Sequence, residues 1–439
     1  MRALTYEGPH TIAVSTMADP VPSDANGAVV RITAAGICGS DLHIYDGHGF
    51  STDLGFCVGH EAVGEVVEVG SGVTAFRPGD RVMVPASTGC GRCEACRANW
   101  VAGCTNGGSG CYGLSHGLEG SQAEAVAVPN ADTNLVALPD SISDDAGLTL
   151  TDNFPTAWYG ARRARIQPGD RVTVVGLGPV GQFSVMSALL MGGSQVFAID
   201  LVPERREAAA KLGATPLTEQ DPIAELRELT GGQGTEVVLE AVGADATIEL
   251  SLRAAARTGR VSVVGVNQTR NFPMNLRLAQ VKELEFSIGL CSVQRELPAL
   301  LRLVAAGRVD PSVVVTHHFG LSDGPAAYEL FAHSAPDCVG SARWSSTRPD
   351  EFLTSCRRSA RRRPPLAGPV SRRYGSGWRS VDRQQKRLDR SGSWSDRRRA
   401  GQRFPSAAHR PKRSVPSSHS SWPIAMRMST TTQRSANSI

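Results

Sequence analysis

Four cysteines lie within fifteen residues of the chain, at Cys90, Cys93, Cys96 and Cys104. Gaps of two residues allow the thiolates of one tight loop to converge, and four sulfurs at about 2.3 Å close a tetrahedron around zinc. Because such a site leaves no exchangeable position, the spacing predicts a structural zinc. Disulfides or unrelated free thiols are the alternatives, and the density of cysteines disfavours both.

Metal-ligand residue types also occur at three separated places: Cys38, His60 with Glu61 beside it, and Asp152. A catalytic zinc site needs about three protein ligands and a fourth position that is open to water or substrate. Cys, His and Asp supply a suitable mixed set. A lone cysteine or histidine is more often a packed core residue, and the spacing alone does not show whether these three meet in space.

A glycine pattern suited to a dinucleotide follows the apolar run at residues 172–175. Gly176, Gly178 and Gly181 form Gly-x-Gly-x-x-Gly between this run and a helical pattern, as in turns that bind a pyrophosphate. Asp200 ends the next apolar run, where a carboxylate can bind ribose hydroxyls and would repel a 2′-phosphate, which favours NAD over NADP. The alternative is a glycine-rich turn in a plain α/β domain.

Two kinds of structure must position these residues. The first 150 residues contain short β patterns separated by Gly and Pro, at 28–32, 64–69 and 80–85. Beyond them helical and strand patterns alternate, which predicts a parallel sheet built from right-handed crossovers and an α/β fold class. The helical patterns cover 154–165, 180–191, 204–212, 245–257 and 294–307, and the strand patterns cover 171–175, 195–199, 236–240 and 260–264.

The formal net charge of +4 combines two unlike pieces of the 439-residue chain. Residues 341–439 hold 23 Lys and Arg against 5 Asp and Glu, whereas residues 1–340 hold 23 against 37. The basic piece is rich in Arg, Ser and Pro and lacks apolar periodicity, so we expect it to be disordered. The acidic piece is the expected globular body.

No segment predicts export or a membrane span. The N-terminal residues lack the basic stretch and apolar run of a secretory signal. Residues 172–199 are uncharged, but glycine and proline interrupt them, which favours buried strands and a helix over a transmembrane helix. We expect a reduced, cytoplasmic protein, because the clustered cysteines indicate metal and not disulfides.

The chain resembles the zinc-containing medium-chain alcohol dehydrogenase family. Four motifs carry the resemblance over roughly residues 1–340: Gly-Ile-Cys-Gly-Ser-Asp-Leu-His at 36–43, Gly-His-Glu at 59–61 followed by Gly64, the four-cysteine segment, and the glycine turn at 176–181. The domains that the resemblance implies are a β-rich, GroES-like catalytic domain at 1–150, a Rossmann NAD-binding domain at 151–290, a return to the catalytic domain at 291–340, and a tail at 341–439.

The same resemblance assigns a catalytic zinc to Cys38, His60 and Asp152, with the Glu61 carboxylate able to approach the metal. Many family members carry Cys at the third position, and Asp there is most similar to the formaldehyde dehydrogenase branch. Two zinc ions per chain, one catalytic and one structural, are therefore expected together with NAD.

Further site residues follow from the resemblance. Ser40 would take the proton of the alcohol and pass it through the cofactor ribose towards His43 and solvent, while Asp41 would orient His60. Outside this motif, a capping Ser, a turn-forming Asp and a surface His would be the ordinary interpretations. The implied cofactor-binding residues are Gly176, Gly178, Gly181, Asp200, Arg205 and, on the nicotinamide side, Thr156.

The tail has two interpretations. At 340–344 the sequence Gly-Ser-Ala-Arg-Trp replaces the apolar strand expected there, and the abrupt change resembles translation of a GC-rich gene in a shifted reading frame. The rival is an arm that binds nucleic acid or an anionic membrane through its arginines. We favour the non-functional extension, and we expect the lost strand to weaken the catalytic domain.

The predicted function is zinc- and NAD-dependent interconversion of an alcohol with an aldehyde or ketone. A formaldehyde or aldehyde dehydrogenase, favoured by Asp152, and a polyol or amino-alcohol dehydrogenase are alternatives within the family. An alternative of another class is an inactive, metal-stabilised binding protein with an aberrant terminus. The resemblance implies a homodimer or homotetramer that acts on a small-molecule alcohol or aldehyde and not at a membrane.

Overall fold

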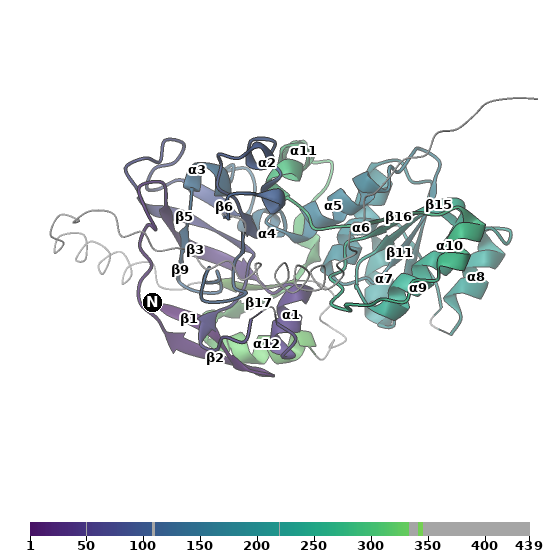
Figure 1. The fold of residues 1–439 in the computed structure, drawn as a ribbon, viewed down its shortest axis with the longest axis horizontal. Coiled ribbons are helices and arrows are strands. Elements are labelled where there is room, and N and C mark those ends of the chain that lie inside the picture. The colour runs from purple at the N-terminus through teal and green to yellow at the C-terminus, as the bar shows by residue number, and fades with distance from the viewer. Residues whose placement is uncertain (50, 108–109, 219, 333–340, 346–439) are drawn as a thin grey trace, which may run out of the picture. The chain divides into compact units, whose positions relative to one another are not determined.

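The computed structural model describes residues 1–49, 51–107, 110–218, 220–332 and 341–345. All of them belong to one unit of the chain, Met1–Ser376. This unit contains a β-rich part and a part built on a parallel sheet (Figure 1). Within the described ranges, no helix combines the length and the apolar character that crossing a membrane requires.

The β-rich part is built on three sheets among the described residues. The largest has the order β10-β6-β5-β3-β18-β17 with β9 paired to β3, and the others are β2-β1-β4 and β7-β8. The strands are β1 (Arg2–Gly8), β2 (Thr11–Thr16), β3 (Ala28–Gly36), β4 (Phe56–Cys57), β5 (Ala62–Val69), β6 (Arg81–Val84), β7 (Ser87–Thr88), β8 (Gly110–Cys111), β9 (Ala125–Val128), β10 (Val136–Ala137), β17 (Val315–Gly320) and β18 (Ser341–Ser345).

The pairing of β3 with β5 positions the first two candidate ligands. Both strands are rich in valine, whose branched side chain suits a partly buried sheet. They run antiparallel and Ala35 pairs with Ala62, so the end of β3 lies beside the start of β5. Cys38 follows β3 by two residues and His60 precedes β5 by two. Strand pairing therefore brings the two residues close together.

The β-rich part also carries helices that precede the parallel-sheet part in the sequence and helices that follow it. They are α1 (Gly39–Tyr45), α2 (Glu94–Arg97), α3 (Ala131–Asn134), α4 (Asp144–Thr149), α11 (Val293–Ala305) and α12 (Gly324–Ala332), with the short 3-10 helices η1 (Val101–Gly103), η2 (Pro311–Val314) and η3 (Leu321–Asp323). Tyr328 and Phe331 of α12 pack in the same hydrophobic core as Val30 of β3 and Val66 of β5. Residues near 330 thus belong to the core that the first strands build.

The second part is a six-stranded parallel sheet in the order β13-β12-β11-β14-β15-β16. The strands are β11 (Arg171–Val175), β12 (Gln195–Ile199), β13 (Thr215–Pro216), β14 (Thr235–Glu240), β15 (Ala255–Val263) and β16 (Glu285–Ile288), and the helices are α5 (Asn153–Arg163), α6 (Pro179–Leu190), α7 (Pro203–Lys211), α8 (Pro222–Leu229), α9 (Asp245–Ala254) and α10 (Leu276–Lys282). The strand order reverses between β11 and β14. Ligands of open parallel sheets bind beside the carboxyl ends of the strands at such a point, where the glycine turn lies.

The predicted α/β fold class with its doubly wound parallel sheet is confirmed. The helix predicted over 180–191 is α6, and the strand predicted over 195–199 is β12. The helix predicted over 245–257 is too long, because α9 ends at Ala254 and β15 begins at the next residue. Alanines favour a helix locally, but here pairing with β14 in the buried sheet outweighs that propensity. The sequence patterns do not predict α8, α10 or β16.

The closing strand that the sequence led us to regard as lost is present. β18 pairs parallel with β17 and antiparallel with β3, so residues 341–345 are not part of a disordered tail. Sheet hydrogen bonds join backbone groups and do not require apolar side chains, which is why the change in composition did not reveal this strand. The rest of the predicted tail, from residue 346 onwards, lies outside the described residues.

Candidate functional site

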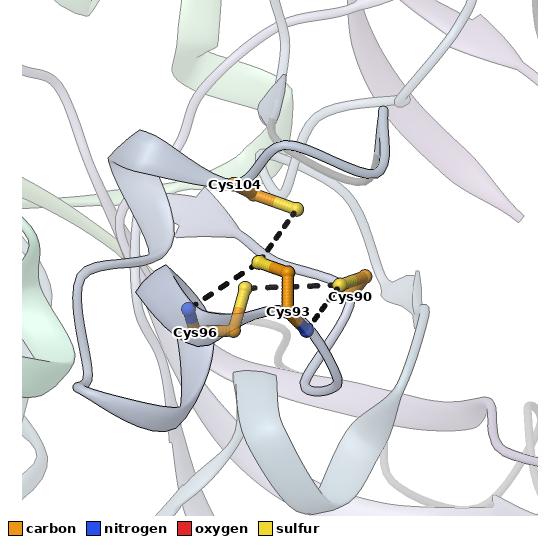
Figure 2. A group of neighbouring side chains, drawn as sticks. All are labelled: Cys90, Cys93, Cys96 and Cys104. Atoms are coloured by element: carbon orange, nitrogen blue, oxygen red, sulfur yellow. Dashed lines mark hydrogen bonds between the residues drawn. The ribbon is translucent and has the colours of Figure 1, made fainter.

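The four clustered cysteines converge within one loop around α2. The sulfurs point towards one another in Figure 2, with 3.9 Å from Cys90 Sγ to Cys96 Sγ and from Cys93 Sγ to Cys104 Sγ. A tetrahedron with Zn–S bonds of about 2.3 Å has edges of about 3.8 Å, whereas a disulfide requires about 2.0 Å. The donor set and its spacing therefore fit a four-sulfur zinc site.

Backbone N–H groups surround these sulfurs. Cys90 Sγ accepts from the N–H groups of Arg92 and Cys93 at 3.4 Å each, and Cys93 Sγ accepts from Cys96 N–H at 3.5 Å. The N–H groups of Cys96 and Thr105 lower the pKa of the Cys93 thiol to about 6. A loop that stabilises a thiolate in this way is prepared to receive a metal cation.

The structure also brings Cys38, His60 and Asp152 together. One ligand atom of each lies within 4.8 Å of the others. Asp152 Oδ2 is 3.7 Å from Cys38 Sγ and 3.4 Å from His60 Nε2. Cys38 and His60 are buried, and Asp152 is partly exposed. A sulfur, a nitrogen and a carboxylate oxygen at these separations fit a zinc ion with three protein ligands.

Asp152 occupies the N-cap position of α5 without capping the helix. An Asp at this position usually accepts from a backbone N–H of the first turn. Here Oδ1 accepts from the Thr156 hydroxyl at 3.1 Å, while Oδ2 faces the other two candidate ligands. The carboxylate is thus directed into the candidate metal site. Thr156, which the resemblance implies on the nicotinamide side, contacts the third candidate ligand directly.

Asp41, on α1, lies behind the other two candidate ligands. Its Oδ2 accepts from the Cys38 backbone N–H at 2.9 Å, and its Oδ1 lies 2.9 Å from His60 Nδ1. A carboxylate at one ring nitrogen of a histidine leaves the other nitrogen for a metal. Asp41 therefore has the position of an orienting residue and not that of a ligand.

Glu61 and Asn153 form a buried pair beside the three candidate ligands. Asn153 Nδ2 donates to Glu61 Oε1 at 2.6 Å, and Asn153 Oδ1 lies 3.6 Å from Cys38 Sγ. The other carboxylate oxygen of Glu61 lies against Gly36, where a Cβ atom would stand 2.5 Å from Oε2. Burial and the Asp152 carboxylate raise the pKa of Glu61 to about 8. Glu61 is close to the converging ligands but is held beside them by Asn153.

Ser40 contacts two of the candidate ligands. Its Oγ lies 3.2 Å from Cys38 Sγ and 3.2 Å from His60 Nε2. His43 follows three residues later on α1, on the same face of the helix, and is half-buried. Within the described ranges, the side chains of Ser40 and His43 make no hydrogen bond to each other. A proton relay between them would therefore need a bridging group.

The three glycines of the turn after β11 differ in what they permit. Gly176 has a φ of +85°, and a Cβ on Gly181 would stand 1.9 Å from the Gly176 carbonyl oxygen. A Cβ on Gly178 would meet no atom within 4 Å. Gly178 is the N-cap of α6, whose first N–H groups attract phosphate. The open space at Gly178 therefore fits the close approach of a pyrophosphate.

Asp200 follows β12 beside this turn. Its Oδ2 accepts from Leu177 N–H at 2.7 Å and its Oδ1 from Val202 N–H at 2.8 Å. Gln182 Nε2 donates to the carbonyls of both Leu177 and Arg205 at 2.9 Å, which places Arg205 next to the turn as well. In the described part of the chain, the buried Nε of Arg205 has no hydrogen-bond partner. The Asp200 carboxylate and the backbone of Arg205 thus lie beside the glycines.

Sequence reasoning assigned no role to two residues that act on the candidate ligands, Asn153 by contact with Cys38 and Cys111 through charge. Burial raises the pKa of the Cys111 thiol to about 12, and the charges of His60 and Asp152 act on it as well. Asn153 directly follows Asp152, and this adjacency was the available signal. Cys111 gave no signal in the sequence, because its position depends on the pairing of β8 with β7.

Comparison with known proteins identifies the family. The family described as "Alcohol dehydrogenase GroES-like domain" matches residues 24–140, and the family "Zinc-binding dehydrogenase" matches residues 179–306. A probable zinc-binding alcohol dehydrogenase of Mycobacterium tuberculosis is 39% identical over 333 residues, in an alignment that covers 75% of this chain and 84% of that protein. The chain belongs to the zinc-containing medium-chain alcohol dehydrogenase family.

Two further relatives support membership of this alcohol dehydrogenase family. An alcohol dehydrogenase of Cupriavidus necator is 35% identical over 354 residues, which cover 76% of this chain and 95% of that protein. The solved structure of an alcohol dehydrogenase from Thermus sp. ATN1 is 38% identical with a TM-score of 0.73, covering 79% of this chain and 99% of that one. The family resemblance seen in the sequence motifs is confirmed.

Proposed function

We propose that the chain is an NAD-dependent alcohol dehydrogenase that holds two zinc ions and interconverts an alcohol with an aldehyde or ketone. The observation that supports this most is the convergence of Cys38, His60 and Asp152 beside the Ser40 hydroxyl. Membership of the family supports the reaction class. The cysteine loop supports the second zinc.

In the proposed enzyme the three converging residues hold the catalytic zinc and the four cysteines hold the structural one. Bound zinc supplies Lewis acidity, which lowers the pKa of an alcohol hydroxyl, and bound NAD supplies a hydride acceptor. The chain itself orients the ligands. Asp41 faces His60 Nδ1, and the Thr156 hydroxyl holds the Asp152 carboxylate in place.

Ser40 is the proposed acceptor of the substrate hydroxyl proton, because its Oγ lies against two of the metal ligands. His43 is the proposed outlet for this proton. Burial lowers the pKa of His43, so its ring is neutral at neutral pH and a ring nitrogen can accept a proton.

Asp200 supports NAD in preference to NADP. Its carboxylate lies beside the glycine turn, where it can accept hydrogen bonds from ribose hydroxyls and would repel a 2′-phosphate. Gly178, with its open space, is the proposed contact point of the pyrophosphate, and Arg205 contributes positive charge nearby.

Replacing Gly178 by Ala should weaken NAD binding by about ten-fold or more, or about 1.4 kcal/mol, because the new methyl group would occupy the space of the pyrophosphate. The melting temperature should hardly change, since that Cβ meets no protein atom. Titration calorimetry with NAD and thermal unfolding measure the two quantities. Gly181→Ala is the matched control, and it should lower stability because its Cβ overlaps the Gly176 carbonyl. Unchanged NAD affinity in folded Gly178→Ala would contradict the proposed coenzyme site.

Reduction of coenzyme, followed by absorbance, tests the proposed function directly. The zinc-loaded chain is offered primary alcohols, secondary alcohols, polyols and aldehydes, with NAD and NADP in parallel. Oxidation of at least one alcohol with NAD is expected, and a strong preference for polyols or aldehydes would select the corresponding alternative. A zinc-loaded chain that oxidises no alcohol, or that accepts only NADP, contradicts the proposal. The expected homodimer or homotetramer is measured by light scattering on the same preparation.

A further inference from the structure

A buried chain of polar side chains runs from α12 to the candidate metal site. Its members are Tyr328 on α12, Gln122 before β9, Asp41 on α1 and His60 before β5. Their exposed fractions are 0%, 0%, 1% and 3%. Polar groups are kept in a dry interior only when their partners are in place, so the position of each member depends on its neighbours.

Gln122 is the middle member, and its orientation is determined by its surroundings. Its Nε2 donates at 2.7 Å to the carbonyl oxygen of Gly36, which can only accept, so the amide nitrogen must lie on that side. The Tyr328 hydroxyl donates to Oε1 at 2.9 Å, and Nε2 also lies 3.4 Å from Asp41 Oδ2. The side chain is tightly enclosed, because a Cβ on Gly59 would stand 2.3 Å from Gln122 Cγ.

Asp41 transmits this constraint to two candidate ligands. Its Oδ2 accepts from Cys38 N–H and from Gln122 Nε2, at 2.9 and 3.4 Å, so this oxygen is anchored on two sides. Rotation of the carboxylate is thereby restricted, and Oδ1 stays in an ion-pair contact 2.9 Å from His60 Nδ1, although among the described residues the two atoms are not aligned as a hydrogen bond. A carboxylate at this distance from one ring nitrogen orients the imidazole, so that Nε2 is directed at the metal position.

We propose that Gln122 and Tyr328 are positioning residues for the catalytic metal, acting through Asp41 on His60 and Cys38. This inference rests on the proposed function only in requiring a metal at the three converging residues. It makes the metal site depend on α12, a helix near the end of the described chain. Loss of the Tyr328 hydroxyl should therefore loosen the metal although no atom of Tyr328 touches a ligand.

The test is the rate at which full-length, zinc-loaded protein releases each metal to a chelating dye at neutral pH. Cys38→Ala identifies which phase of release belongs to the catalytic site. Removing a residue directly behind a ligand, here Asp41, costs about 10–100-fold in affinity. Gln122 lies one contact further from the ligands, so we expect at most about ten-fold faster release in Gln122→Met and about three-fold in Tyr328→Phe. Release from the cysteine loop should not change. The double variant should release metal no faster than Gln122→Met, because Tyr328 acts through Gln122.

Tyr112→Phe is the matched control. Tyr112 is also fully buried, but among the described residues its hydroxyl has no hydrogen-bond partner, so its removal should leave metal release unchanged. Release from Gln122→Met and Tyr328→Phe at the rate of Tyr112→Phe overturns the inference, as does a double variant in which the two effects multiply. Should Tyr328→Phe fold poorly by circular dichroism, Gln122→Met decides. The assay uses no substrate, so a chain with both zinc ions but no alcohol oxidation would overturn the proposed function alone.

Discussion

The two candidate metal sites of this chain are built in opposite ways. The cysteine loop takes four sulfurs from residues 90–104, whereas the catalytic candidate takes its ligands from residues 38, 60 and 152. In the loop, backbone N–H groups lower the pKa of Cys93 to about 6, while in the catalytic candidate burial raises the pKa of Cys38 to about 11. Burial also raises the pKa of Cys96 in the loop to about 12, so the contrast lies in Cys93, whose thiolate is stabilised by N–H groups of its own loop.

The two metal sites are therefore encoded differently in the sequence, and we expect one to support stability and the other activity. Closing a short loop costs little chain entropy, so spacing alone can encode the cysteine loop. The catalytic candidate exists only after β3 has paired with β5 and α5 has packed beside them. Damage to the loop should therefore appear as lost stability, and damage to the catalytic candidate as lost activity.

The largest effect is expected for Cys93→Ser. The structural zinc should be released and the free energy of unfolding should fall by several kcal/mol, because in small cysteine sites a zinc affinity of about 10–16 kcal/mol is also folding energy. Thermal unfolding combined with metal analysis measures both changes. A variant with the metal content and melting temperature of the parent chain would show that the cysteine loop does not hold a stabilising zinc.

Asp152→Ala tests the catalytic candidate, the site formed by Cys38, His60 and Asp152. Loss of the third ligand should lower kcat/KM about a thousand-fold, since the catalytic zinc would no longer be held. Stability should change little, because Asp152 does not cap α5. Steady-state kinetics and thermal unfolding are the measurements. Asp152→Cys is the control, because its thiolate can replace the carboxylate as a ligand and should retain the metal. If Asp152→Ala unfolds like Cys93→Ser and keeps its activity, the two sites have the reverse roles.

The same contrast explains what could be predicted from the sequence. The cysteine loop and the glycine turn are local patterns, and the structure has both where their spacing placed them. The meeting of Cys38, His60 and Asp152 depended on the family resemblance, because no spacing rule connects residues 114 positions apart.

Other features depend on tertiary pairing and left no pattern to find. Asn153 reaches Glu61 because α5 begins beside β5, and the position of Cys111 depends on the pairing of β8 with β7. β18 lies inside the stretch whose composition indicated a disordered tail, yet backbone pairing with β17 and β3 forms a strand there. The amino-acid composition of residues 341–345 does not predict this strand, because its pairing is made by backbone hydrogen bonds.

A small effect on stability is expected for a change in α3, the helix that contacts the start of the cysteine loop. Asn134 on α3 holds Gly89, the residue before Cys90, with Oδ1 2.8 Å from its nitrogen and Nδ2 3.0 Å from its oxygen. Asp132 on the same helix accepts from the Thr74 hydroxyl at 2.6 Å and from its N–H at 3.0 Å. Asp132 thus binds α3 to the segment at Thr74, and α3 in turn holds the start of the cysteine loop through Asn134.

Asp132→Asn should lower stability at neutral pH by less than about 1 kcal/mol, because the carboxylate is exposed and screened by solvent. Partial burial raises the pKa of Asp132, but hydrogen bonds from Thr74 and Ala75 outweigh it and lower the pKa overall. The stabilisation is therefore present above the ordinary Asp pKa and disappears as the pH falls through the lowered value. Urea unfolding at neutral and acid pH measures it. A difference that persists at acid pH would show that charge is not the cause.

The chain is proposed to hold two metals with separate roles, and counting zinc per folded chain tests this proposal most directly. Full-length protein should contain two zinc ions. Cys38→Ala should contain one, lose less thermal stability than Cys93→Ser and oxidise no alcohol with NAD. A Cys38→Ala protein that keeps both zinc ions and its activity would contradict the assignment of a catalytic zinc to Cys38.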